Sequence, residues 1–201
     1  MSTLRRWMIM LCLCLSGGVI YLLPFLREIY YLPMQEALQL TNTQLGVLMS
    51  VFGVTAMISY FPGGWLADRI GASRTIAWSF IILIFSFGVF AVTPGSPSLV
   101  FILVVNTVIA SIAIYALRGV YYAIFEEVGI PLAVTGTATG VVSVIGYTPD
   151  IFIPLAGGAL LDGYPGTLGY RYFFLFISGL CFLGLLAALV LMKKYVKTRV
   201  G

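Results

Sequence analysis

Residues 63–75 read GGWLADRIGASRT and form a charged stretch between two long apolar runs. Asp68, Arg69 and Arg74 lie within seven residues here, whereas only 9% of the whole chain is charged and 61% is hydrophobic. The mean hydropathy of the chain is +1.07, well outside the range of soluble domains. We therefore expect an integral membrane protein in which residues 63–75 form a polar loop between two membrane spans.

The apolar runs on both sides of this loop are long enough to cross a membrane as helices. A helix needs about 20 apolar residues to cross about 30 Å of hydrocarbon, whereas barrel strands need only about 10 alternating residues. The sequence thus predicts an all-α membrane protein with six transmembrane helices, the fifth interrupted by Pro149 and Pro154. The expected spans are residues 7–26, 45–61, 76–92, 99–125, 137–161 and 172–192.

The Lys and Arg residues of the short loops predict the orientation, because these residues are enriched on the cytoplasmic side. With the N-terminus inside, eight of them are cytoplasmic and two, Arg27 and Arg171, are outside. Both termini are then cytoplasmic, and the net charge of +4 reflects this bias rather than nucleic-acid binding. The eight are Arg5, Arg6, Arg69, Arg74, Lys193, Lys194, Lys197 and Arg199.

The N-terminal run and the cysteines each leave an alternative to weigh. Residues 1–18 could be a secretory signal peptide, but the apolar run continues to Leu26, which is long for that role. Cys12, Cys14 and Cys181 lie in apolar runs, where cysteines are typically small apolar residues rather than disulfide or metal ligands. The chain has no histidine, so we expect no metal site and no cofactor.

The charged loop also matches a known pattern. Gly64, Asp68, Arg69, Gly71 and Arg74 resemble the G-x-x-x-D-R-x-G signature loop of the major facilitator superfamily, although Ala72 and Ser73 stand where that loop usually has basic residues. Glycines there allow a tight turn and close packing, and Asp68 can cap a helix N-terminus. The alternative is an ordinary charged turn between two helices.

The resemblance implies a secondary transporter with twelve helices in two related six-helix halves, but 201 residues are too few for twelve spans. Residues 1–68 resemble the first two helices of the first half. Residues 71–201, with RGVYYAIFEEVGIP and GTATGVVSVIGYTPDIFIPLAGGALLD, resemble the last four helices of the second half. We therefore expect one domain over residues 1–201, a facilitator-type half bundle of two three-helix units, fused at the signature loop.

Arg118 and the residues after it are candidates for a substrate path. A charge at membrane depth costs roughly 2.5–3.5 kcal/mol, so a charged residue there typically has a functional role. Arg118 and Tyr122 are four residues apart and would share a helix face, with Glu126 and Glu127 following. Arg118 would contact an anionic substrate. The alternative is a structural arginine that reaches the interface or pairs with a carboxylate such as Glu126.

Two further charges lie in or at the end of predicted spans. Asp150 follows Pro149 near the middle of the fifth, where a broken helix and a carboxylate are typical of transporter ion sites. Asp150, Glu126 and Glu127 are therefore candidates for proton coupling, unless Asp150 lies at a wet helix end. Arg27, with Tyr21 nearby, ends the first span and forms either a cationic lip for substrate or an ordinary interfacial anchor.

Together these features predict a multi-pass protein of the inner (plasma) membrane that is not an enzyme. The function expected is secondary transport, by symport with protons or another ion, of a small polar solute such as an organic anion or sugar derivative. Its partners would be the lipid bilayer, the solute and a second copy of the chain, which would complete the pathway as a homodimer. The alternatives are a non-transporting membrane subunit and an inactive truncated remnant.

Overall fold

The computed structural model describes residues 8, 11, 12, 32, 41–94, 97–146 and 148–194. Over these residues the protein consists of helices and turns, with no strand. The 3-10 turns are η1 (Pro97–Leu99), η2 (Tyr121–Ala123) and η3 (Leu132–Val134). The α-helices are α4 (Asn42–Ile70), α5 (Ala72–Val92), α6 (Val100–Val120), α7 (Ile124–Glu127), α8 (Thr135–Gly146), α9 (Pro149–Gly163) and α10 (Thr167–Lys194).

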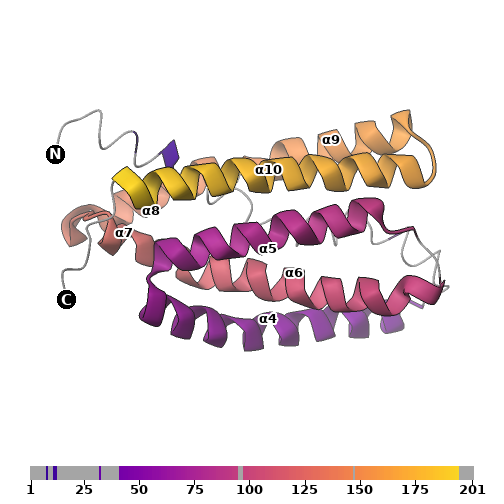
Figure 1. The fold of residues 1–201 in the computed structure, drawn as a ribbon, viewed down its shortest axis with the longest axis horizontal. Helices are drawn as coiled ribbons and strands as arrows, with labels where there is room; N and C mark the ends of the chain where they lie inside the picture. The colour runs from indigo at the N-terminus through magenta and orange to yellow at the C-terminus, as the bar shows by residue number, and fades with distance from the viewer. Residues whose placement is uncertain are drawn as a thin grey trace.

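Helix α5 is central among the long helices, which run side by side along the long axis of the bundle (Figure 1). It packs against α6 on one side and α10 on the other, while α4 lies on α6 and α9 on α10. Ile76, Phe80, Leu83 and Phe87 recur on one helical face of α5 and are almost completely buried. The core of the described bundle is therefore built around this one helix.

Hydrogen bonds from side chains to backbone tie α5 to both neighbours. The buried Asn106 amide of α6 donates to the carbonyl oxygen of Ser86 at 2.9 Å. On the opposite side, the Ser178 hydroxyl of α10 donates to the carbonyl oxygen of Ile84 at 3.2 Å. Such polar contacts help to fix how neighbouring helices are oriented toward each other. The main attraction between helices in lipid is van der Waals packing.

The lengths of the helices confirm the helical character of the predicted spans. Three helical segments are long and apolar enough to cross a membrane, namely residues 72–92, 101–127 and 167–194. They correspond to the third, fourth and sixth expected spans, and α4 covers and extends the second. The first expected span falls outside the described residues apart from Met8, Leu11 and Cys12, so six spans and cytoplasmic termini stay predictions.

The predicted fifth span is divided into two helices at only one of its two prolines. Helix α8 ends at Gly146, and Pro149 takes the first position of α9. That position suits proline, because its missing N–H would have no partner in the helix and its fixed φ is already helical. Pro154 lies inside α9 without ending it, so the expected interruption there is wrong.

The stretch predicted as a loop is mostly helical, which corrects the sequence analysis. Helix α4 continues through Pro62, Gly63 and Gly64 to Ile70, and α5 begins at Ala72. Only Gly71 separates the two helices, with a φ of 95°, a conformation open to glycine and strained for other residues. Its N–H donates to the carbonyl oxygen of Ala67 at 2.8 Å and so satisfies the end of α4.

Gly63 serves close packing instead of a turn. A Cβ placed on Gly63 would lie 2.6 Å from the Cα of Ala116 on α6, whereas one on Gly64 would meet nothing within 4 Å. The absence of a side chain at Gly63 therefore lets the backbones of α4 and α6 approach each other, as small residues do at helix contacts in membranes.

These neighbouring glycines provide a matched pair of variants. Gly63→Ala forces a methyl group against backbone atoms, and overpacking of this kind costs about 1–3 kcal/mol. We expect the melting temperature of the purified protein in detergent to fall by about 5 °C. Gly64→Ala should leave it unchanged or raise it, because alanine is the better helix former. Equal effects of the two variants would show that α4 and α6 do not cross at Gly63.

Candidate functional site

A carboxylate from a distant part of the chain caps the N-terminus of α5. The Oε1 atom of Glu127, at the end of α7, accepts a hydrogen bond from the N–H of Ala72 at 2.6 Å. Its Oε2 atom accepts one from the N–H of Ser73 at 3.1 Å. A helix N-terminus has unpaired N–H donors and a partial positive charge, and both favour a carboxylate. The two hydrogen bonds join segments 54 and 55 residues apart.

This geometry corrects the role expected for Asp68 and adds one to Glu127. Asp68 lies exposed in the last turn of α4, and no hydrogen bond or ion pair joins it to another residue that the structure describes. The cap on α5 is Glu127, which the sequence suggested only as a coupling group. Both of its carboxylate oxygens are engaged by backbone donors, and a role in proton coupling stays a prediction.

Gly71 is required at this junction for a second reason besides its positive φ. A Cβ on Gly71 would lie 2.9 Å from the Oε1 atom of Glu127. A side chain there would push the carboxylate off the N–H groups that it accepts from. The glycine of the signature pattern therefore leaves room for the glutamate that caps the next helix.

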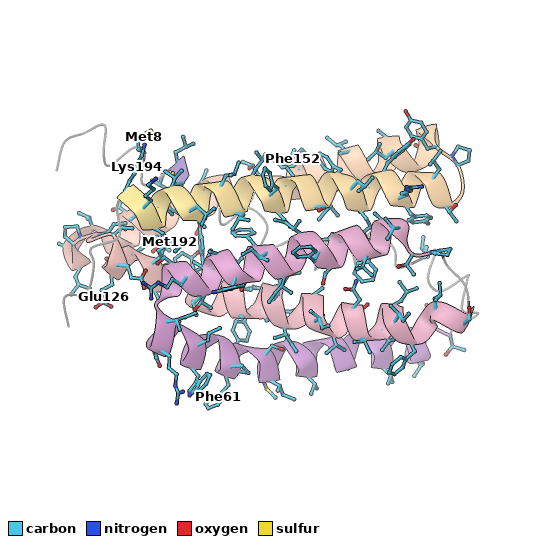
Figure 2. The ribbon with its side chains drawn as sticks, viewed as in Figure 1. Met8, Phe61, Glu126, Phe152, Met192 and Lys194 are labelled. Carbon is cyan, nitrogen blue, oxygen red and sulfur yellow. The ribbon has the colours of Figure 1, made fainter. Side chains whose placement is uncertain are left out.

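The cations of the signature loop lie at the same end of the bundle. The guanidinium of Arg69 lies 4.1 Å from the ring centroid of Trp65, a cation–π contact one helical turn apart. Arg74 is exposed in the first turn of α5. Lys193 and Lys194 end α10 at this same end, where Figure 2 also places Glu126. Four cations predicted to be cytoplasmic thus gather at one end of the described helices.

A polar contact near the end of α6 links it to α8. The Tyr122 hydroxyl and the Ser143 hydroxyl lie 3.1 Å apart. The ring of Tyr122 makes edge contacts with Tyr121 and Phe125, at centroid distances of 5.2 and 5.6 Å. Ser143 was not among the predicted site residues, and its spacing of 21 residues from Tyr122 gives no periodic signal.

Arg118 lies half-buried in the last turn of α6, three residues before the start of the 3-10 turn that contains Tyr122. The backbone of Asp150 lies in the first turn of α9, next to the break at Pro149. Tyr21 and Arg27 fall outside the described residues. Arg118, Tyr122 and Asp150 therefore all belong to irregular ends of helices, while their roles toward a solute stay predictions.

An all-helical bundle with several segments able to span a membrane, and with cations gathered at one end, defines a multi-pass membrane protein. The family model of the Major Facilitator Superfamily matches residues 7–200. The chain belongs to this superfamily. It is a multi-pass protein of the inner membrane.

Curated proteins with similar sequences include two from Escherichia coli (strain K12), the inner membrane proteins YqcE and YihN. Each is 38% identical over 81 residues, which is 40% of this chain and 19% of that protein. A Bacillus subtilis protein described as "Probable galactarate/D-glucarate transporter GudP" is 34% identical over 88 residues, 41% of this chain and 19% of that protein. The matched stretch is thus about a fifth of the length of these relatives.

The adjacent glutamates test the cap on α5. Glu127→Ala removes two hydrogen bonds from a helix N-terminus and should destabilise the protein by about 2 kcal/mol, because hydrogen bonds to charged groups contribute about that much. Glu127→Gln keeps one acceptor and should cost less. Glu126→Ala is the control, since Glu126 is exposed and makes no such contact with α5. Thermal melts of the three variants in one detergent give the ranking, and a Glu126 effect as large as that of Glu127 would contradict the cap.

Proposed function

We propose that this protein is a secondary transporter of a small organic anion, coupled to protons or another ion. Membership of the Major Facilitator Superfamily carries the proposal, together with a half-buried arginine in the last turn of a membrane-spanning helix. A cation at that depth is costly and typically marks a substrate path or a structural ion pair. For Arg118 we propose the first role.

Two arguments support an anionic solute. An arginine guanidinium offers a fork of N–H donors that matches a carboxylate. The Bacillus subtilis relative is named for galactarate and D-glucarate, which are sugar acids with two carboxylates. Tyr122 and Ser143, held 3.1 Å apart, could in addition hydrogen-bond the hydroxyl groups of such a solute. We therefore propose a hydroxylated carboxylate as the substrate class.

For ion coupling we propose Asp150. Its backbone follows a break between α8 and α9, and breaks of this kind free backbone carbonyls at the sites where transporters bind ions. The chain has no histidine, and acidic side chains inside membranes are typical members of proton relays in transporters. Glu126 is a weaker candidate because it is exposed at the end of the bundle.

A complete pathway needs two bundles that move against each other around a central site. We propose that a second copy of this chain supplies the second bundle. A non-transporting membrane subunit is the second candidate function, because the matched stretch covers only 19% of relatives such as YqcE. We also propose that residues 1–68 and residues 71–201, which resemble different parts of the family, are fused at the signature loop.

Uptake into proteoliposomes tests transport directly. With radiolabelled D-glucarate and an inward proton gradient, the wild-type protein should accumulate the solute. Arg118→Gln should lower uptake about tenfold, because losing a charged hydrogen bond costs about 1.5–3 kcal/mol and 1.4 kcal/mol is a factor of ten. Arg118→Lys keeps the charge and should retain part of the activity. No uptake by folded wild-type protein of D-glucarate or of a panel of related carboxylates would favour the subunit.

A matched pair of aspartates on α9 separates coupling from folding. Asp150→Asn should abolish the dependence of uptake on the proton gradient while leaving exchange of internal for external solute. Asp162→Asn makes the same change at an exposed position near the end of the same helix and should keep both activities. A gradient dependence that survives Asp150→Asn would remove Asp150 from the proposed mechanism.

The mass of the protein in detergent, from light scattering corrected for detergent and lipid, tests the second copy. A mass of two chains is the expected result, because a single bundle has half a pathway. A monomer at all concentrations that still transports would contradict the dimer. A monomer without transport would support the subunit.

A further inference from the structure

The end of the bundle away from the Glu127 cap contains a cavity of about 500 Å³. It lies between the C-terminal end of α5, the first turns of α10 and Leu103 of α6. Figure 1 shows these helix ends together, at the opposite end from α7. A volume of this size falls within the range of sites for small ligands, about 300–1,000 Å³.

The inner wall of the cavity is aromatic. Phe90 and Phe174 both line it, and their rings stack with centroids 5.2 Å apart. Phe87, which is almost completely buried, lies behind them with its ring centroid 6.4 Å from that of Phe174. This stacked group belongs to the core of the bundle, so it gives the cavity a fixed apolar wall.

The rim of the cavity is positively charged. Arg171 lines it, and no carboxylate among the described residues forms an ion pair with this guanidinium. Thr93, Thr167 and Tyr170 add polar groups to the same lining. The first turn of α10 has no acidic residue, so the positive end of that helix adds to the charge of Arg171. An anion is the complementary ligand.

Two exposed tyrosines near the cavity are of a kind typical of the depth of lipid headgroups. Tyr164 and Tyr172 are exposed, with their rings in edge contact at 4.8 Å, and flank the first turn of α10. Tyrosines of this kind are enriched where the membrane meets water. Exposed apolar side chains adjoin the rim as well, with Leu168 exposed to 42% and Val92 to 67%. Acyl chains could lie against them.

We propose that this cavity binds the headgroup of an anionic phospholipid, with the phosphate at Arg171 and the acyl chains along the apolar outer surface. The mixture of one cation, hydroxyl groups and an aromatic wall suits a molecule with an anionic head and apolar tails better than a free anion. By the distribution of basic residues this end of the bundle faces the outer leaflet, so the lipid comes from that side.

The test compares the melting temperature of the delipidated protein in detergent with three additions. These are dioleoyl phosphatidylglycerol, dioleoyl phosphatidylcholine and glycerol 1-phosphate, the last of which has the phosphate without acyl chains. Phosphatidylglycerol should raise the melting temperature by about 5 °C when it is well above its Kd, because a ligand that binds the folded state alone stabilises it. The other two should have little effect. Equal stabilisation by glycerol 1-phosphate would overturn the lipid and assign the site to a free phosphate.

Two variants on one helix locate the effect. Arg171→Gln should lose most of the stabilisation by phosphatidylglycerol, and Arg171→Lys should keep part of it. Lys193→Gln makes the same charge change at the other end of α10 and should respond like the wild type. Arg171 is exposed, so its loss should not prevent folding. Equal responses of Arg171→Gln and Lys193→Gln would overturn the proposal, because the lipid effect would then be general electrostatics.

Discussion

The carboxylate of Glu127 at the N-terminus of α5 is the contact on which the described bundle depends. Buried backbone donors must be satisfied within the protein, and the first turn of α5, where Ala72 and Ser73 are buried, has donors that the helix itself cannot pair. Glu127 pairs two of them, at Ala72 and Ser73. Because α5 packs against both α6 and α10, fixing its start also fixes the end of the bundle where the signature residues lie.

The sequence predicted the helices of the second, third, fourth and sixth spans, because hydrocarbon thickness constrains their length directly. It predicted the junction at Gly71 poorly, because charged residues next to glycines favour a loop, whereas α4 remains helical through residues 62–70. Membrane helices tolerate proline and glycine where neighbouring helices pack closely, as Ala116 does on Gly63. That contact, like the cap by Glu127, joins residues far apart in sequence. Periodicity and spacing carry no information on such pairs.

The charged residues of the candidate site could be predicted, because charged residues stand out in an apolar sequence. Arg118 and Asp150 were identified because each is costly in hydrocarbon, and both belong to places where a regular helix ends or begins. Ser143 could not be found in this way, since an uncharged hydroxyl in a helix is common. Its contact with Tyr122 depends on how α8 returns toward the end of α6. The sequence alone therefore indicates the charged residues in the predicted spans, whereas the residues that contact the site become known only from the fold.

The two ends of the bundle hold α5 in different ways. At one end, α4 and α5 are joined by a single residue and α5 is capped by a carboxylate from α7. At the other end, α5 and α10 leave a cavity bounded by Arg171 and stacked phenylalanines. The start of α5 is thus fixed by hydrogen bonds, and its C-terminal end by apolar packing around the buried Phe87 and Ala91.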